Sequence, residues 1–205
     1  MHSSTSSDIS NNSDNTDTSS NYSGEYSDNY NIDISNRAKQ YKVVYDLEQL
    51  SNFHSCTALD YRTQTVYLFV IHESRNDIVS YINFLERCVV MSGYNNINYD
   101  YPMLHYILTN KDTLVLLTPQ QINKILYAES QRIIDSGKLA GSTGFKKRTI
   151  PANQIIIPQL DLMAINSLTN EARRASLKQL QFAMRGGNLQ EMPIHHYSVV
   201  KTEQV

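Results

Sequence analysis

Three short apolar segments open the part of the chain that carries a hydrophobic pattern. Residues 41–46 and 65–72 are rich in β-branched and aromatic residues, residues 53–60 form another short run between them, and a polar turn at 61–64 separates the last two. Such runs bounded by polar turns are typical of β-strands. Because the connections are too short to hold a helix, the pattern predicts an antiparallel meander of three strands.

The apolar residues then recur with the period of a helix. Residues 77–87 place three large apolar side chains on one helical face. Residues 88–93 indicate a buried strand that ends at a glycine, and residues 100–108 a further helix with Pro102 in its first turn, where proline is tolerated. The chain thus changes from strands to alternating helices and strands.

The remaining segments continue this alternation. Residues 118–134 are expected to form a long amphipathic helix, followed by a loop rich in glycine and lysine at 136–149. Residues 154–162 favour a strand that reaches Asp161, and residues 175–184 a last helix.

This order of elements predicts an α/β fold, a mixed sheet built from an antiparallel meander plus parallel strands and flanked by helices. The layout resembles that of the RNase H-like group. We expect one such domain over residues 37–205, with a helical insertion at about 111–152.

Composition separates a tail from this domain. Residues 1–36 are mostly Ser, Asn, Asp and Thr, with six acidic residues and no Lys or Arg, so we expect them to be disordered. Of the 20 acidic residues in the chain, 14 remain in the domain against 18 basic ones. A mildly basic domain suits a nucleic-acid partner, although many other enzymes share this balance.

No signal peptide or transmembrane segment is recognisable, so an intracellular location is expected, in the cytoplasm or nucleus of a host cell. The two cysteines, Cys56 and Cys88, lie far apart in apolar runs and are expected to be buried, reduced thiols.

Two carboxylates lie two residues apart near the end of the first strand. Residues i and i+2 of a strand point to the same face, so Asp46 and Glu48 would repel each other unless a cation lay between them. Mg²⁺ prefers such oxygen ligands. Alone, this pair also fits a solvated strand end, and Asp100 after an Asn-rich turn also fits an ordinary helix N-cap.

Together these segments resemble the exonuclease domains of family B DNA polymerases of the phage, plasmid and viral kind. Residues 45–48 (YDLE) resemble the first exonuclease motif, Asp-x-Glu, and residues 95–100 (NNINYD) resemble the second. Residues 160–163 and 175–180 resemble the later Asp-Leu and Ser-Leu-Lys-x-Leu stretches, and residues 188–193 continue the likeness.

The resemblance implies a 3′–5′ exonuclease of the DEDD type, which hydrolyses phosphodiesters with two Mg²⁺ (or Mn²⁺) ions. It implies that Asp46, Glu48 and Asp100 are catalytic metal ligands. It also implies that Asn95, Asn96 and Tyr99 position the terminal nucleotide or support the loop. Asp161 is expected to have a structural role.

The third motif of that family, Tyr-x-x-x-Asp, is missing from its expected place, because Tyr197 is followed four residues later by Lys201. Thr202 instead resembles the N-cap of a further helix. Three interpretations remain: a truncated paralogue with little or no activity, half of a split enzyme completed by a second polypeptide, or replacement of the lost group by Glu203 or a histidine. Loss of a positioned base costs roughly 10²–10⁴ in rate.

Two functions therefore remain open. The first is an impaired exonuclease acting on 3′ ends of single-stranded DNA, with Lys138 and the basic residues 146–148 following the DNA backbone. The second is a non-catalytic module that binds nucleic acid or a replication partner. The frequent Asn, Ile and Tyr suit an AT-rich genome, such as that of a phage or a large DNA virus.

Overall fold

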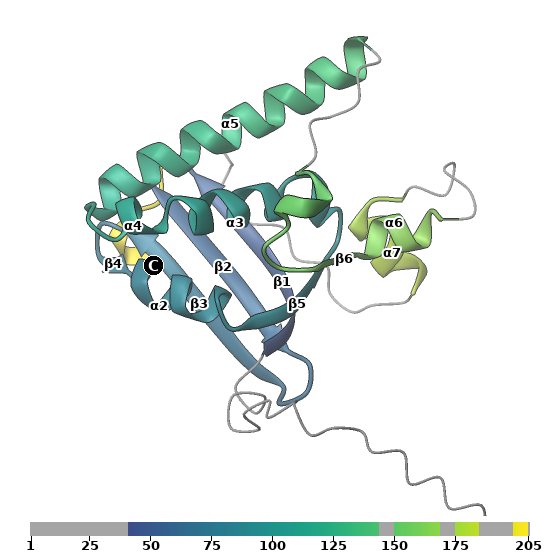
Figure 1. The fold of residues 1–205 in the computed structure, drawn as a ribbon, viewed down its shortest axis with the longest axis horizontal. Coiled ribbons are helices and arrows are strands. Elements are labelled where there is room, and N and C mark those ends of the chain that lie inside the picture. Colours follow the sequence, from purple (N-terminus) through teal and green to yellow (C-terminus); the bar gives the residue numbers. More distant parts are fainter. Residues whose placement is uncertain (1–40, 144–149, 169–174, 185–198, 205) are drawn as a thin grey trace, which may run out of the picture. The chain divides into compact units, whose positions relative to one another are not determined.

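The structure, a computed structural model, describes residues 41–143, 150–168, 175–184 and 199–204 (Figure 1). The expected disordered tail at 1–36 lies outside the described residues.

A six-stranded mixed sheet forms the centre of the described domain, in the order β4-β3-β2-β1-β5-β6. β1, β2, β3 and β4 pair antiparallel in sequence order, whereas β5 is parallel to β1 and β6 is parallel to β5. The predicted α/β class is confirmed, and the sheet is consistent with an RNase H-like arrangement. The strands are β1 Tyr41–Leu50, β2 Phe53–Asp60, β3 Thr65–His72, β4 Arg75–Asn76, β5 Cys88–Gly93 and β6 Gln159–Asp161.

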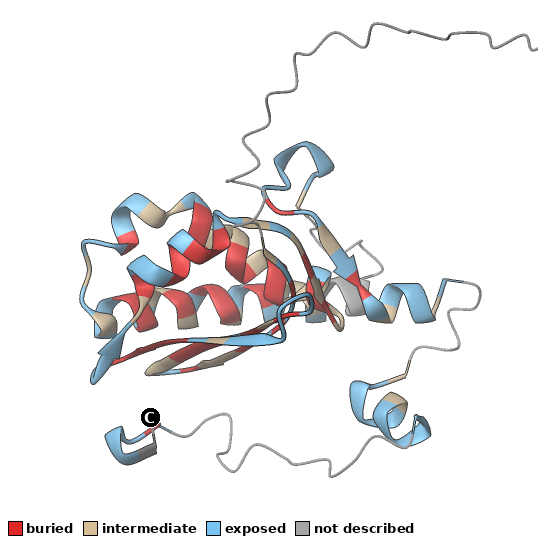
Figure 2. Cartoon of the chain, turned by 90° about the horizontal axis from the view of Figure 1, so that it is seen from below, coloured by how far each residue is buried: buried red, intermediate tan, exposed pale blue. Residues whose placement is uncertain are grey.

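Three of the helices, α2, α3 and α5, pack on one face of the sheet, where Figure 2 shows their buried residues turned toward the strands. The helices are α2 Ile78–Leu85, α3 Asp100–Thr109, α4 Lys111–Leu114, α5 Pro119–Thr143, α6 Leu162–Asn166 and α7 Leu177–Ala183. Short 3₁₀ turns are η1 Asn96–Asn98, η2 Ala152–Gln154 and η4 Thr202–Gln204.

The core lies between this face and the three helices. Alternation along β1 buries Val43, Tyr45 and Leu47 on the helix side, and the same side of β3 buries Phe69 and Ile71. Each such side chain stabilises the fold by about 1.5–3 kcal/mol. The helices complete the core with Tyr81, Leu85, Met103, Leu104, Ile107, Ile122 and Leu126.

The first strand is longer than its sequence pattern predicts. It was expected to end at residue 46, but it continues to Leu50 because its pairing with β2 extends to the Leu50–Phe53 pair. Asp46 and Glu48 therefore lie within a strand rather than beyond its end.

Two expectations in the second half of the chain are wrong. The helix expected over 118–134 continues to Thr143, so the loop expected over 136–149 is helical up to that residue, and 144–149 lie outside the described residues. The strand expected over 154–162 is reduced to Gln159–Asp161. The expected helical insertion contains α4, α5 and η2.

Two smaller findings concern single features. Cys56 is buried and Cys88 is partly buried, and neither forms a disulfide. Among the described helices, none combines the length and the apolar character needed to cross a membrane.

Candidate functional site

The candidate site lies along the part of β1 that pairs with β2 but no longer with β5. β1 pairs with β5 only as far as Val44, opposite Ser92, whereas it pairs with β2 to its end. The carboxyl half of β1 thus has one open edge, next to the carboxyl end of β5. Ligands of open α/β sheets bind at such places, outside the carboxyl ends of parallel strands.

Asp46 and Glu48 lie along this open half of β1. They alternate with the buried Tyr45 and Leu47, so both carboxylates belong to the face of the sheet opposite the helical layer. Asp46 is exposed and Glu48 is half-buried. The strand therefore places both side chains on the same face, as predicted.

A compact loop connects the end of β5 to Asp100, the first residue of α3. The loop begins at Gly93, where a Cβ atom would lie 2.8 Å from the Cβ of Asn96, so the close approach excludes larger residues. Asn95 adopts a left-handed conformation with φ of 61°, which asparagine tolerates better than most residues. The loop thus turns the chain directly from β5 into α3.

Asp161, the last residue of β6, holds this loop in place. Its carboxylate accepts hydrogen bonds from the backbone N–H of Asn95 at 2.9 Å and of Ile97 at 3.4 Å. It also caps α6 by accepting from the N–H of Met163 at 2.9 Å and of Ala164 at 3.3 Å. One buried carboxylate therefore joins β6, α6 and the loop before Asp100, as its predicted structural role requires.

The side chain of Asn96 anchors the loop to β1 and β6. Its side-chain amide is fully buried and donates to Oε1 of Gln159 at 2.9 Å and to the hydroxyl of Tyr45 at 3.4 Å. The Tyr45 hydroxyl itself donates to the same Gln159 oxygen at 2.9 Å. Asn96 thus supports the loop, and its buried side chain has no access to a nucleotide.

The three carboxyl groups influence one another electrostatically. Burial, then the charge of Asp46 and more weakly that of Glu48, raises the pKa of Asp100 to about 7, against the lowering effect of the Leu47 backbone amide. Partial desolvation by the surrounding residues also raises the pKa of Asp46, although its side chain is exposed, and that of Glu48, for which the charge of Asp46 adds to the effect. The ionised site is therefore destabilised by its own negative charge.

A cavity of about 360 Å³ adjoins these carboxylates. Glu48 and Tyr99 line it from one side, and Tyr127, Ser130 and other residues of α5 line it from the other. The Tyr99 hydroxyl lies 2.8 Å from Oγ of Ser130, which fixes the ring against α5. The cavity is large enough to admit a small polar ligand beside Glu48.

The donor set has the chemistry that a hard cation prefers, although it is incomplete. Within the described ranges, no Lys or Arg forms an ion pair with Asp46, Glu48 or Asp100. Among the same residues, no group of three or more His, Cys, Asp or Glu side chains is close enough to hold a metal ion. A pair of carboxylates with water or phosphate oxygens in the other positions is still a typical Mg²⁺ environment.

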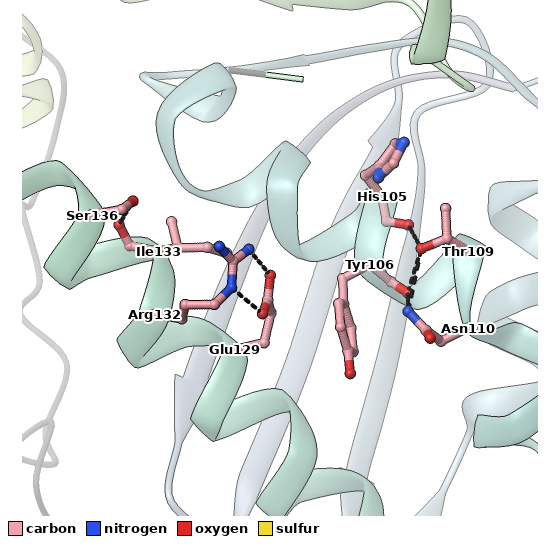
Figure 3. Close-up of polar contacts among 8 residues, drawn as sticks. All are labelled: His105, Tyr106, Thr109, Asn110, Glu129, Arg132, Ile133 and Ser136. Atoms are coloured by element: carbon pink, nitrogen blue, oxygen red, sulfur yellow. Dashed lines mark hydrogen bonds and ion pairs between the residues drawn. The ribbon is translucent and has the colours of Figure 1, made fainter. Parts of the chain in front are cut away.

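A second cavity, of about 460 Å³, lies between α3 and α5. Its wall includes the pair of Glu129 and Arg132, in which both carboxylate oxygens accept from the guanidinium, and Figure 3 shows this pair facing the side of α3 that carries Tyr106. Nε2 of His105, on α3, donates to the carbonyl oxygen of Gln154 at 3.0 Å. Since its main charges neutralise each other, this cavity lacks the unpaired carboxylates of the first.

Asp46, Glu48 and Asp100 lie near enough for the charges of the first two to raise the pKa of Asp100, although within the described residues they do not form a group that could hold a metal ion together. Tyr99 lines the cavity beside Glu48. Tyr45 and Gln159, which complete the support of the loop, were missed by the sequence analysis. No local pattern identifies them, because their contacts join segments more than 60 residues apart.

Comparison of the chain with known protein families, with curated proteins and with solved structures finds no match.

Proposed function

We propose that the described domain is a metal-dependent, 3′–5′ exonuclease-like domain that hydrolyses phosphodiesters at the 3′ end of single-stranded DNA. The observation that carries this proposal is the buried carboxyl of Asp100 beside Asp46, at the open carboxyl half of the central strand. Its pKa is raised to about 7, and the described residues supply no cation to offset it.

A divalent cation would relieve this repulsion. Asp46 and Asp100 are the residues that would hold it, with Glu48 orienting the attacking water from the same face as Asp46. When bound, such an ion supplies charge for the scissile phosphate and lowers the pKa of a bound water. The resemblance to family B exonuclease motifs supports metal binding by Asp46 and Asp100, and it implies that Glu48 binds a metal as well as orienting the water.

The cavity next to Glu48 is the expected place of the terminal nucleotide. Tyr99 and Tyr127 offer aromatic surface there, and bases stack on aromatic side chains with little sequence preference. Burial raises the pKa of Tyr99, so its hydroxyl stays protonated near neutral pH.

Hydrolysis by this chain alone is expected to be slow. A complete site of the family uses four carboxylates and a tyrosine base, whereas the site proposed here has the carboxyl groups of Asp46, Glu48 and Asp100 only. A second polypeptide that supplies a Tyr-x-x-x-Asp helix would raise the rate by roughly 10²–10⁴.

The test is degradation of a 3′-labelled single-stranded oligonucleotide with Mg²⁺ or Mn²⁺, compared with EDTA. Asp46→Ala should abolish release of the label, and Asp112→Ala, a change at an exposed aspartate of α4, should leave it unchanged. Activity that persists in Asp46→Ala would belong to a contaminant and would refute the proposal.

The alternative is a non-catalytic module that binds a DNA end or a replication partner. The observation that favours it is the lack of a three-ligand metal group within the described residues. The same experiment separates the two functions: binding of the oligonucleotide without any metal-dependent loss of label supports the alternative.

A further inference from the structure

The sheet face opposite the helical layer carries an apolar row that crosses five strands. The strand register aligns Leu160 with Ser92, Ser92 with Val44, Val44 with Leu59, and Leu59 with Val66. We name the four apolar residues of this line, Leu160, Val44, Leu59 and Val66, the apolar row; Ser92 lies between Leu160 and Val44. Val44, Val66 and Leu160 are exposed, with 62% of Val66 accessible. An aligned apolar row of this length is costly to leave in water.

One end of this face is already covered by a later part of the same chain. Val200 is buried, and Nε2 of His72 lies 3.3 Å from its carbonyl oxygen. By alternation along β3, His72 belongs to the same face as Val66. Both backbone polar groups of Val200 bond to the side chain of Asn52, at 2.8 and 2.9 Å.

A second part of the chain, at Ala175, is anchored next to the end of β5. The hydroxyl of Tyr94, which directly follows β5, donates to the carbonyl oxygen of Ala175. Ala175 is thus anchored beside β5 and Val200 beside β3, strands that lie about 15 Å apart in the sheet at the usual strand spacing. α7 begins right after this anchor, capped by Ser176, and its seven residues span about 10 Å.

α7 has a surface that matches the apolar row. Leu177, Leu180 and Met184 recur at helical spacing and form one stripe, and Leu177 and Met184 are exposed. Lys178 is the one charged residue of the helix. The row next to the apolar row contains Asp46, opposite Thr57.

We propose that α7 packs across the apolar row of its own chain and forms a second helical layer on the sheet. The contact continues the one that Val200 makes on the same face. Docked there, α7 forms a wall one row away from Asp46 and two rows away from Glu48. This docking does not depend on the proposed nuclease function.

A crosslinking experiment on the full chain tests the contact. Val44→Cys with Leu180→Cys, in a Cys88→Ala background, is treated with a short bismaleimide at low protein concentration. We expect a crosslinked monomer as the main product. The control pair, Val79→Cys with Leu180→Cys, should crosslink at least tenfold less, since Val79 lies on α2 in the helical layer.

Hydrogen exchange gives an independent measurement that does not require new cysteines. Amides of α7 should exchange at least tenfold more slowly in the wild type than in Val66→Lys. The control Val79→Lys, at a valine of similar exposure, 55%, should keep the protection. Crosslinked dimers, or protection that rises with protein concentration, would assign the apolar row to a second copy and overturn the proposal. Exchange of α7 at the rate of a free chain would also overturn it.

Discussion

The carboxylate of Asp161 accepts a hydrogen bond from the backbone N–H of Asn95, 66 residues earlier in the chain, at 2.9 Å. This bond ties the last residue of β6 to the loop that leads into Asp100. The position of Asp100 relative to β1 is thus determined by a strand that contributes no candidate metal ligand.

Asp161→Asn keeps the shape of this side chain and removes its charge. The amide can accept at one oxygen only, whereas the carboxylate serves four N–H groups with two. We expect the free energy of unfolding, measured with urea, to fall by about 2–3 kcal/mol. The exposed Asp135 on α5 offers a matched control, and Asp135→Asn should change it by less than about 0.5 kcal/mol.

Asp100→Asn should stabilise the metal-free protein in a manner that depends on pH. The folded protein raises the pKa of this acid from 3.8 to about 7, so the folded state holds the proton more tightly than the unfolded chain. Stability from this group is therefore greatest below pH 4 and is lost as the pH rises through 7.

The variant removes that loss, so its advantage over the wild type should approach zero at pH 4 and reach up to about 4 kcal/mol at pH 8. Urea unfolding in EDTA at both pH values measures this difference, with Asp112→Asn as the control. An equal effect of Asp100→Asn at the two pH values would show that the carboxyl is not perturbed by burial.

Mn²⁺ should stabilise the wild type through the same carboxylates. At a concentration one hundred times the dissociation constant, the gain is about 2.7 kcal/mol, a rise of several degrees in Tm. The rise should vanish in Asp46→Asn and in Asp100→Asn, each compared with its own metal-free Tm, and persist in Asp112→Asn. An undiminished rise in Asp100→Asn would place the ion elsewhere.

Local sequence pattern predicts the elements that depend on local physics. β2, β3 and β5 have the predicted bounds, because each is a short run closed by a polar turn or a glycine. α7 begins at Ser176, whose capping box with Gln179 is legible in the sequence.

The failures have a common cause in contacts between distant segments. Residues Ile155–Ile157 resemble a buried strand, yet only Ile157 is buried, and pairing with β5 begins at Gln159, after Pro158. The sequence pattern cannot show where a partner strand becomes available. The same holds for the site: the pairing of Asp46 and Glu48 follows from alternation, whereas the support of Asn96 by Gln159 depends on tertiary structure.

Gly93→Ala tests the close approach on which the loop depends. A Cβ atom at this position would lie 2.8 Å from the Cβ of Asn96, an atom close to the backbone that cannot rotate away. We expect a loss of about 1–3 kcal/mol in urea unfolding. Gly137→Ala, within α5, should instead be neutral or stabilising by up to about 1 kcal/mol, since alanine favours helices.

Asn52→Ala should release the segment at 199–204 from the sheet. The Asn52 side chain bonds to both backbone polar groups of Val200, as a neighbouring strand would, and alanine can replace neither bond. We expect the amide of Val200 to exchange with solvent at least tenfold faster, and the free energy of unfolding to fall by about 1–3 kcal/mol. Ser51→Ala, at the exposed neighbour in the same turn, controls for changes in the turn itself. Unchanged exchange at Val200 in Asn52→Ala would mean that its burial beside His72 suffices to hold the segment.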